Sequence, residues 1–514
     1  MSGARAARRI GDLSPTLLAR DLGIGFAEGT TQVERKLRGQ YFTQPAVAQF
    51  MASLFTATGS EVSILDPCAG TGVLACAAVE HFAQQPRRPR CIRLVCCEND
   101  PRLLRVLATA LNSLTILARS RRIKLEVEVR PGDYLLDYQP ERGQYSCIII
   151  NPPYYKLGRG DPRCQPNPWP ATVVPNIYAA FLLKCAAELA DGGELVSITP
   201  RSFSSGAYFR AFRRVYFSHL RLDRLHLFED RDDAFSHDDV LQENVIMRCA
   251  RHPARPDRPI AVSTSKGVGD LGEATAILVA ARDIFDVTSN AWMLRLPSSN
   301  LQLAAVRTVS ALDHTLASLG LQASTGRVVP FRCTSFLSRA ASGKTAPLLW
   351  MQHVQRGRVT WPLSGFAKPQ YIIADQASAP LLIQRSCYVL VRRFSAKEDP
   401  WRVVAAPLSS DAIGIAHLGV ENHLNVISSA DGPLSQERAE LLSEYLNSEL
   451  VDLYLRTLSG HTQVGATELL SLPMPGWEDM RGVTRQQQHA GASSRPRTLR
   501  NAARRSRVVG EKNG

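Results

Sequence analysis

Short apolar runs alternate with helical patterns across residues 61–150. The runs VSILD, IRLVCCE, IKLEVEV and YSCIII are typical of strands, whereas VLACAAVEHFA and DPRLLRVLATALNSL repeat apolar residues three and four positions apart, as helices do. A further helical stretch, IYAAFLLKCAAELA, ends at Asp191-Gly192-Gly193 and is followed by the strand-like run ELVSITP. Strands that alternate with helices form βαβ units, so the pattern predicts one α/β domain with a parallel sheet up to about residue 250.

A different pattern begins near residue 320. The runs LLIQRSCYVLVRRF, RVVAAPL and LNVISS are strand-like, with no regular helix between them. They are followed by a predicted helix over 435–458, with Ser435 as the N-cap and Gly460 just past the end. Its apolar stripe consists of Ala439, Leu442, Leu446, Leu450 and Leu453. The segment RHPARPDRP, with three Pro and no periodicity, predicts an exposed connection before this second, mixed α+β domain.

Composition and charge narrow the class of protein. A chain of 514 residues with 45% hydrophobic residues buries more than one core, which excludes disorder throughout. The formal net charge of +14 favours a polyanionic partner, nucleic acid first and an anionic membrane surface as the alternative. Residues 481–514 hold nine Lys and Arg against one Glu, so they are expected to be a solvated extension or a weak electrostatic tether.

Cysteine spacing and apolar run lengths indicate the compartment. The eleven Cys show no repeated C-x-x-C spacing, so no disulfide framework and no metal site are expected. No run approaches the ~20 apolar residues that span a bilayer, and the basic N-terminus lacks the apolar stretch of a signal peptide. A cytoplasmic protein that does not enter a membrane is the expectation.

Three carboxylates follow three consecutive predicted strands. In ILDPCAGTGVLACAA, Asp66 ends a strand, and Gly70 and Gly72 lie in the turn that opens the next helix. Glycines there allow close backbone approach to a ligand at the strand ends of a doubly wound sheet. Glu98 suits two ribose hydroxyls and Asp133 an adenine amino group. Each residue alone also fits a tight turn or a helix N-cap, but together they predict a nucleoside pocket.

Five motifs in one order carry a family resemblance. They are RGQYFTQPAVAQFM (38–51), DPCAGTG (66–72), CEND (97–100), GDYL (132–135) and NPPY (151–154). The series resembles the gamma class of N6-adenine DNA methyltransferases, the TaqI-like methylases of type II restriction-modification systems, well over residues 35–250 and loosely beyond. It implies a Rossmann-like doubly wound methyltransferase sheet, with S-adenosylmethionine as methyl donor and the N6 amino group of adenine in duplex DNA as acceptor.

The resemblance implies roles for individual residues of the cofactor site. Tyr41, Phe42 and Thr43 close over the donor. Asp66 and Gly70 contact its methionine part, Glu98 its ribose and Asp133 its adenine. The expected cofactor-binding residues in full are Tyr41, Phe42, Thr43, Asp66, Pro67, Ala69, Gly70, Gly72, Glu98, Asn99, Asp133 and Tyr134.

The sequence NPPY at the end of a strand suits the chemistry of an exocyclic amine. Adenine N6 is a poor nucleophile because its lone pair is delocalised into the ring. Asn151 Oδ1 and the Pro152 carbonyl are acceptors for its two protons, and the consecutive prolines, Pro152 and Pro153, hold them in place. Tyr154 stacks on the base. The alternative for NPPY alone is a loop punctuated by prolines.

A base in duplex DNA reaches such a pocket only by rotating out of the stack, which costs a few kcal/mol. In HLFEDRDDAFSHDDVLQENVIM (226–247), Phe235 aligns with the family aromatic that stacks on the second face of the base. Phe228 is the rival, and either Phe fits a core position. Arg201, in TPRSFSSGAYFRAFRR, is a candidate phosphate contact or a helix surface residue, as are Arg210, Arg213 and Arg214.

In the family, a C-terminal target-recognition domain selects the DNA sequence. The candidate contacts here, each alternatively a solvated charge, are Arg356, Arg358, Arg392, Arg393 and His461. The expected domains are a 1–34 extension, a 35–255 catalytic domain, a 256–319 connecting segment, a 320–476 DNA target-recognition domain and a 477–514 basic disordered tail.

Other functions share parts of this pattern. RNA and protein-amide (glutamine) N-methyltransferases use NPPY for the same amino-group chemistry but usually lack a large C-terminal domain. A non-catalytic DNA-binding protein fits poorly, because residues 151–154 are all intact. The motifs begin at about residue 35, so any cognate restriction endonuclease is expected to be a separate chain.

Overall fold

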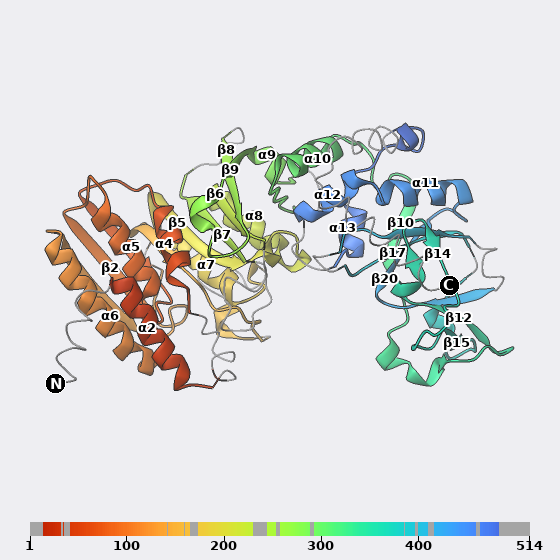
Figure 1. Ribbon diagram of the computed structural model, residues 1–514, viewed down its shortest axis with the longest axis horizontal. Coiled ribbons are helices and arrows are strands. Elements are labelled where there is room, and N and C mark those ends of the chain that lie inside the picture. The colour runs from red at the N-terminus through yellow and green to blue at the C-terminus, as the bar shows by residue number, and fades with distance from the viewer. Residues whose placement is uncertain are drawn as a thin grey trace, which may run out of the picture. The chain divides into compact units, whose positions relative to one another are not determined.

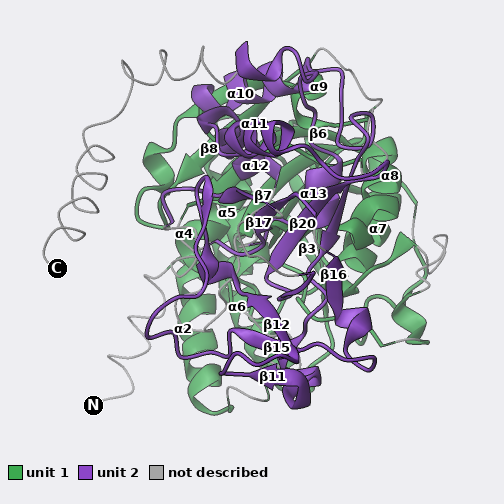
Figure 2. Cartoon of the chain, turned by 90° about the vertical axis from the view of Figure 1, so that its right-hand side faces the viewer, with its two compact units in different colours: residues 1–299 green, residues 300–514 purple. Residues whose placement is uncertain are grey.

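The computed structural model divides the chain into two compact units, residues 1–299 and 300–514 (Figure 2). The residues described are 14–31, 34, 42–140, 142–158, 160–164, 173–229, 244–252, 258–287, 292–384, 386–395, 399–409, 416–458 and 463–482. No helix within these ranges is long and apolar enough to cross a membrane.

A large mixed sheet forms the centre of the first unit (Figure 1). Its strand order is β3-β2-β1-β4-β5-β7-β6-β8-β9; the first five strands run parallel, and β7 is antiparallel to both β5 and β6. The strands are β1 Glu61–Asp66, β2 Cys91–Glu98, β3 Lys124–Pro131, β4 Tyr145–Ile150, β5 Leu189–Pro200, β6 Arg221–Phe228, β7 Asn244–Ala250, β8 Pro259–Ser265 and β9 Ala276–Ala280. The predicted α/β sheet is confirmed, except that β7 is antiparallel where a parallel sheet was expected, and β1 and β4 lie next to each other in the parallel part.

Helices cover both faces of this sheet. They are α2 Pro15–Glu28, α4 Pro45–Ser53, α5 Val73–Gln84, α6 Pro101–Ser120, α7 Ile177–Glu188, α8 Arg210–His219 and the short α9 Ala281–Ile284. Val196 and Ile198 of β5 share an apolar cluster with α4, α5 and α6, whereas Ser197 between them faces Tyr216 of α8. Successive strand residues point to opposite faces, so α8 lies on the face opposite to α4, α5 and α6.

Two expected boundaries of the first unit are wrong. The 1–34 extension contains α2, which packs on α5 and α6; Thr16 of α2 donates to the buried carboxylate of Glu80 from its backbone N at 3.1 Å and from Oγ1 at 2.8 Å. The 256–319 connecting segment contains β8 and β9, which extend the sheet. Both segments carry apolar residues that are buried in the first unit. For residues 256–319, the Pro-rich stretch before β8 had indicated an exposed connection instead.

The second unit contains a four-stranded sheet, β10-β20-β17-β18, a five-stranded sheet, β11-β15-β12-β19-β16, and the pair β13-β14. Its strands are β10 Leu321–Thr325, β11 Leu337–Ser338, β12 Thr345–Leu349, β13 Val354–Gln355, β14 Arg358–Val359, β15 Tyr371–Ile373, β16 Leu382–Gln384, β17 Tyr388–Arg392, β18 Ala405–Leu408, β19 His417–Val420 and β20 Leu424–Ser429. Its helices are α10 Asn300–Ser310, α11 Gln436–Leu446, α12 Glu449–Leu458 and α13 Ala466–Leu470. The mixed α+β character is as expected.

The single helix expected over 435–458 is two helices. Ser435 caps α11 as predicted, accepting from the backbone N of Arg438 at 3.3 Å. The break follows at Asn447, whose amide bonds both the backbone N and O of Ala405 on β18, at 2.9 and 2.8 Å. Residues 477–482, which the expected tail includes, are part of the second unit, because Met480 is fully buried and Trp477 lies against Arg438.

The turn after β1 depends on glycine at two positions. Gly70 has φ +55° and Gly72 φ +90°, and Gly72 is also the N-cap of α5. A Cβ at Gly72 would lie 2.9 Å from Leu107 Cδ1 of α6. The close packing of α5 on α6 therefore requires glycine here for both conformation and space.

We expect Gly72→Ala to lower the free energy of unfolding by more than the roughly 1–2 kcal/mol that a left-handed conformation costs an L-residue, because its methyl group also meets Leu107. Gly143→Ala is the matched control: Gly143 has φ +71°, and a Cβ there meets nothing within 4 Å. Urea denaturation of both variants measures the difference. Equal losses would show that α6 yields to the methyl group without cost.

Candidate active site

The carboxyl ends of β1, β2 and β4 bring the predicted residues together. In the register of the sheet, Asp66 of β1 pairs with Cys96 of β2, and Leu65 pairs with Ile148 of β4. The chain continues from β1 to β2 on one side and later returns to β4 on the other side of β1, so the strand order reverses here. Such a reversal opens a crevice at the carboxyl ends of the strands, where doubly wound sheets bind ligands.

A cleft lies at this edge. It is lined by Phe42, Pro67, Cys68, Gly70, Cys97, Glu98, Asn99, Leu103, Gly132, Asp133, Tyr134, Asn151, Pro153, Tyr155, Ile177 and Phe181. The lining joins the turn after β1, the ends of β2 and β3, the NPPY segment and α7. Carboxylates, an amide and aromatic rings thus converge on one space, as a nucleoside ligand requires.

Asp66 lies beneath the cleft and is fully buried. Its Oδ1 accepts from the backbone N of Cys68 at 3.4 Å, and its Oδ2 has no hydrogen-bond partner among the described residues. Burial, with a smaller contribution from the charge of Glu98, raises the pKa of Asp66 to about 7. A buried carboxylate oxygen without a partner fits the cationic, amine-bearing methionine part of S-adenosylmethionine.

Glu98 connects the turn after β1 to the end of β2. Its Oε2 accepts from the backbone N of Gly70 and its Oε1 from that of Asp100, both at 2.8 Å. Burial raises the pKa of this carboxyl, while the two backbone donors oppose the rise. The side chain is held at the cleft wall, and carboxylate oxygens accept more than one hydrogen bond, so ribose hydroxyls fit there.

α7 holds the segment that carries Asp133. The fully buried Lys184 donates to the carbonyls of Tyr134 and Tyr138, and its Nζ lies 4.1 Å from the centre of the Tyr134 ring. The Tyr134 hydroxyl donates to Glu188 Oε2 at 2.6 Å, and its ring stacks on Phe181 at 5.5 Å. This buried network fixes the backbone on which Asp133 reaches the cleft.

The amide of Asn151 is oriented by two neighbours. Its Nδ2 donates to Thr43 Oγ1 at 3.0 Å, and its Oδ1 accepts from the Tyr154 hydroxyl at 2.5 Å. The same hydroxyl lies 3.0 Å from the Ile198 carbonyl of β5. The two bonds together fix the rotation of the amide and with it the direction of Oδ1, its acceptor atom.

The structure places most of the expected cofactor residues at the cleft, but not all. Those that line it are Phe42, Pro67, Gly70, Glu98, Asn99, Asp133 and Tyr134, together with Asn151 and Pro153 of NPPY. Thr43, Asp66, Ala69, Gly72, Pro152 and Tyr154 support the cleft without lining it. Tyr41, Phe235 and His461 lie outside the described residues.

Several expected base or DNA contacts have other positions. Phe228, the alternative to Phe235, is buried in the core cluster and is not a base-stacking residue. Arg356 donates to the Asn447 carbonyl and lies 3.7 Å from the Trp401 ring centre, and Arg392 donates to the Val354 carbonyl at 2.7 Å. Both side chains stabilise the second unit from within.

The other candidate arginines differ in exposure. Arg358 is exposed, Arg393 is half-buried and donates to the Asn422 carbonyl at 3.3 Å, and Arg201 is half-buried directly after β5. Arg213 is fully buried, whereas Arg210 and Arg214 are exposed. A buried arginine does not reach a phosphate, so Arg213 is removed from the candidate DNA contacts.

Sequence reasoning missed part of the apolar lining. Ile177 and Phe181 of α7, Leu103 in the first turn of α6, and Tyr155 all face the cleft. Ile177 and Phe181 are four residues apart on the helix that follows NPPY, so they share one face. That spacing was visible in the sequence, although it does not distinguish a ligand-facing side from a core-facing side.

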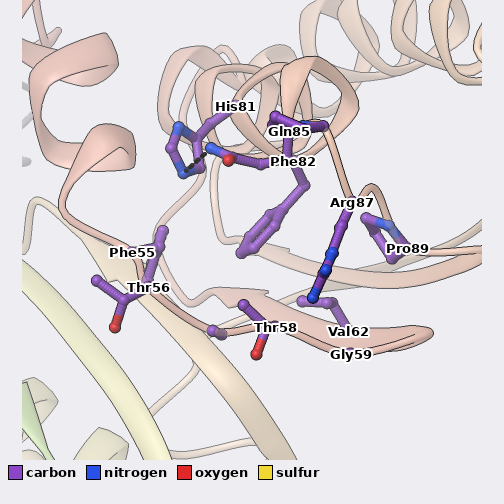
Figure 3. A pocket seen from close by; sticks show the side chains of 12 residues that line it. Phe55, Thr56, Thr58, Gly59, Val62, His81, Phe82, Gln85, Arg87 and Pro89 are labelled. Atoms are coloured by element: carbon purple, nitrogen blue, oxygen red, sulfur yellow. Dashed lines mark hydrogen bonds between the residues drawn. The ribbon is translucent and has the colours of Figure 1, made fainter.

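A second, larger cavity lies at the opposite end of the strands (Figure 3). Its volume is about 310 Å³ against about 100 Å³ for the cleft, and it is lined by residues 55–59, Val62, His81, Phe82, 85–87 and Pro89. No carboxylate lines it. It also lies at the amino ends of β1 and β2, so the chemistry of the lining, rather than volume, makes the cleft the candidate cofactor site.

Comparison with known proteins agrees with this geometry. The N-6 DNA Methylase family model matches residues 26–213. Type II methyltransferase M.PstI of Providencia stuartii is 31% identical over 464 residues, which are 88% of this chain and 90% of that protein. Type II methyltransferase M.BsuBI of Bacillus subtilis is 30% identical over 449 residues, which are 85% and 87%.

Similarity to solved structures is weaker. The DrdV–DNA complex has a TM-score of 0.44 at 13% identity, over 90% of this chain and 58% of that chain. The type IIG restriction endonuclease BpuSI has a TM-score of 0.41 at 13% identity, over 89% and 60%. Membership in the family is therefore shown by the two type II methyltransferases.

The fold and the cleft define a methyltransferase of the α/β class. The chain belongs to the type II methyltransferase family. It is an adenine-specific DNA methyltransferase that uses S-adenosylmethionine, as the series of motifs predicts.

The buried Asp66 carboxyl makes stability depend on pH in an unusual direction. Its pKa is about 7 in the folded protein and 3.8 when unperturbed, so the unfolded state loses the proton first as pH rises. We expect the contribution of Asp66 to the free energy of unfolding to fall between about pH 4 and pH 7. Asp66→Asn, which does not titrate, gains stability relative to wild type over that interval.

Urea denaturation at about pH 5 and about pH 8 measures this gain. Asp270→Asn is the control: backbone donors lower the pKa of that exposed carboxyl, so its effect does not change between the two pH values. Parallel pH profiles for wild type and Asp66→Asn would contradict the assignment of a raised pKa to Asp66.

Proposed function

We propose that the methyl group passes to N6 of an adenine that has rotated out of duplex DNA, with Asn151 Oδ1 and the Pro152 carbonyl accepting its two amino protons. The orientation of the Asn151 amide carries the proposal. Thr43 Oγ1 accepts from Nδ2 at 3.0 Å, which fixes the rotation of the amide and with it the direction of Oδ1, its acceptor atom. Two acceptors off the ring plane localise the nitrogen lone pair and stabilise the charge that develops on it.

The lining of the cleft supports a specific partner for each part of the methyl donor. Asp66 would hold the methionine part, Glu98 the ribose hydroxyls and Asp133 the adenine amino group. Phe42, together with Tyr41, would close over the donor, and Pro67, Ala69, Gly70, Gly72, Asn99 and Tyr134 would shape the remaining wall. When bound, S-adenosylmethionine supplies an electrophilic sulfonium methyl group. This chain has only to position the amine in line with it.

The contact between Tyr154 and Asn151 bears on base entry. The Tyr154 hydroxyl is 2.5 Å from Asn151 Oδ1, the oxygen proposed to receive an N6 proton. A second acceptor, the Ile198 carbonyl, lies 3.0 Å from the same hydroxyl. The hydroxyl therefore has an alternative partner when the base takes Oδ1, and the Tyr154 ring can then stack on one face of the adenine. Phe235 is proposed for the second face.

The second unit is proposed to select the DNA sequence. Among the candidate contacts there, Arg358 is exposed and Arg393 is half-buried. Their guanidinium groups suit phosphates or guanine edges, and the imidazole of His461 is proposed for the same kinds of contact. The domain assignment of residues 320–476 as a target-recognition domain is part of this proposal. We also propose that any cognate restriction endonuclease is a separate chain and that this protein is cytoplasmic.

We expect Asn151→Ala to reduce methyl transfer by at least about 100-fold, the usual scale for losing one group that stabilises a developing charge, while donor affinity survives. Asn151→Asp keeps an acceptor oxygen and should retain more activity than Asn151→Ala. Asp66→Ala should show the reverse pattern, with the dissociation constant of the donor raised at least about tenfold.

Transfer of labelled methyl groups to duplex DNA measures activity, and calorimetric titration with S-adenosylmethionine measures donor affinity. If Asn151→Ala lost donor affinity and activity equally, the residue would be structural, and the proposed acceptor role would be abandoned.

A further inference from the structure

The segment that follows β5 leaves the sheet at the edge where the cleft lies. It consists of the 3-10 turns η3 Arg201–Phe203 and η4 Ala207–Phe209, and it leads directly into α8. Asn151 follows β4, which is the neighbour of β5 in the sheet, with Ile150 paired to Ser197. The segment therefore begins at the same edge as the proposed base pocket.

A buried arginine fixes the shape of this segment. Arg213 of α8 is fully buried; its Nη1 donates to the carbonyls of Phe203 and Gly206, both at 2.8 Å, and its Nε to the Trp292 carbonyl at 2.7 Å. A Cβ at Gly206 would lie 2.9 Å from the Ser202 carbonyl oxygen. The backbone between η3 and η4 is thus held in one tight conformation, with glycine where there is no room for a side chain.

A series of ring contacts links the segment to the catalytic tyrosine. Phe209 stacks on Tyr178 of α7 with ring centres 5.4 Å apart and an interplanar angle of 13°. Tyr178 in turn meets Tyr154 edge to face at 6.3 Å, and its hydroxyl is hydrogen-bonded to Ser202 Oγ at 3.0 Å. Phe209 is therefore anchored one ring away from the residue proposed to stack on the adenine.

Tyr208 points the opposite way. Its exposed fraction is 87%, above that of every other large hydrophobic side chain among the described residues. Arg210 and Arg214, on the adjoining first turns of α8, are exposed as well. Phe209 is anchored on one side of Tyr208, and Arg213 fixes the turn on the other side. The backbone of Tyr208 is therefore rigid, so little conformational freedom remains to be lost when its ring meets a partner.

We infer that Tyr208 stacks on DNA bases beside the adenine that leaves the helix, and that Arg210 and Arg214 contact the adjoining phosphates. The inference rests on the proposed function, since it requires the adenine to rotate out. Unstacking leaves a gap in the duplex, and inserted side chains or stacked rings offset its cost. An exposed aromatic ring beside exposed arginines, in a segment that packs through Phe209 and Tyr178 on Tyr154, has the chemistry for both contacts.

The test uses the full-length enzyme and a duplex that carries its methylation site, found by modification-sensitive sequencing of DNA treated with wild type. Replacing the target adenine with 2-aminopurine reports rotation of the base as a rise in fluorescence. We expect Tyr208→Ala to raise the dissociation constant for this duplex about tenfold and to diminish the fluorescence rise. Tyr208→Phe, which keeps the ring, should bind within about twofold of wild type.

Two controls separate stacking from loss of structure. Leu278→Ala removes another exposed apolar side chain, 65% exposed on β9, and should change neither reading. A mismatch opposite the target lowers the cost of unstacking, so the defect of Tyr208→Ala should shrink on a mismatched duplex. Affinity for S-adenosylmethionine should stay at the wild-type value in all three variants.

The arginines give an independent reading through salt. Replacing Arg210 or Arg214 with Gln should weaken binding to all duplexes alike. It should also reduce the slope of log affinity against log salt by about one for each arginine replaced, because each is inferred to neutralise one phosphate. An unchanged slope would overturn their assignment to phosphates.

Other outcomes would overturn the role of Tyr208. Wild-type affinity and fluorescence in Tyr208→Ala would do so, and so would an equal defect on matched and mismatched duplexes. A change in the mass of the protein in solution, with DNA binding unaffected, would instead make Tyr208 a contact between copies of the chain. If wild type itself gave no fluorescence rise while methylating DNA, the proposed rotation of the base would fail rather than the placement of Tyr208.

Discussion

The hydrogen bond from Asn151 Nδ2 to Thr43 Oγ1 is the contact on which the geometry of the site depends. It joins the segment before α4 to the end of β4, two parts of the chain that are 108 residues apart. The adjacent prolines restrict the backbone of NPPY, but they do not set the rotation of the amide. Thr43, a partner outside the motif, and Tyr154, a partner within it, together fix the rotation of the Asn151 amide. The four-residue motif is therefore incomplete without Thr43.

Around this contact the protein buries several charged groups, which costs stability unless they have partners. Lys184 has two backbone carbonyls and Glu188 the Tyr134 hydroxyl, so this part of the wall is internally satisfied. Asp66 is not, because its Oδ2 has no hydrogen-bond partner among the described residues. Groups with perturbed pKa values that lack partners concentrate where ligands bind. This contrast between Lys184 and Glu188 on one side and Asp66 on the other supports the proposed contact of Asp66 with the donor.

The sequence was informative where local pattern and chemistry coincide. The convergence of Asp66, Glu98 and Asn151, which end or directly follow buried strands, was predictable, because parallel strands place their carboxyl ends on one edge. The packing of α2 into the first unit was not predictable, because Thr16 of α2 binds Glu80, which is 64 residues away in the chain. The break at Asn447 likewise depends on β18, and Arg356 and Arg392 resembled DNA contacts until their carbonyl partners were known. Pairings between distant segments leave no periodic trace in the chain.

Two kinds of hydrogen bond, fixed and exchangeable, occur in neighbouring parts of the first unit. Arg213 donates to three carbonyls from a buried guanidinium, and this arrangement fixes the turn before Phe209. The Tyr154 hydroxyl, by contrast, lies within reach of two acceptors and has one proton to give. Exchanging Asn151 Oδ1 for the Ile198 carbonyl replaces one hydrogen bond with another. A base that took Asn151 Oδ1, as proposed, would therefore leave no buried hydroxyl unpaired, a state that costs about 1–3 kcal/mol.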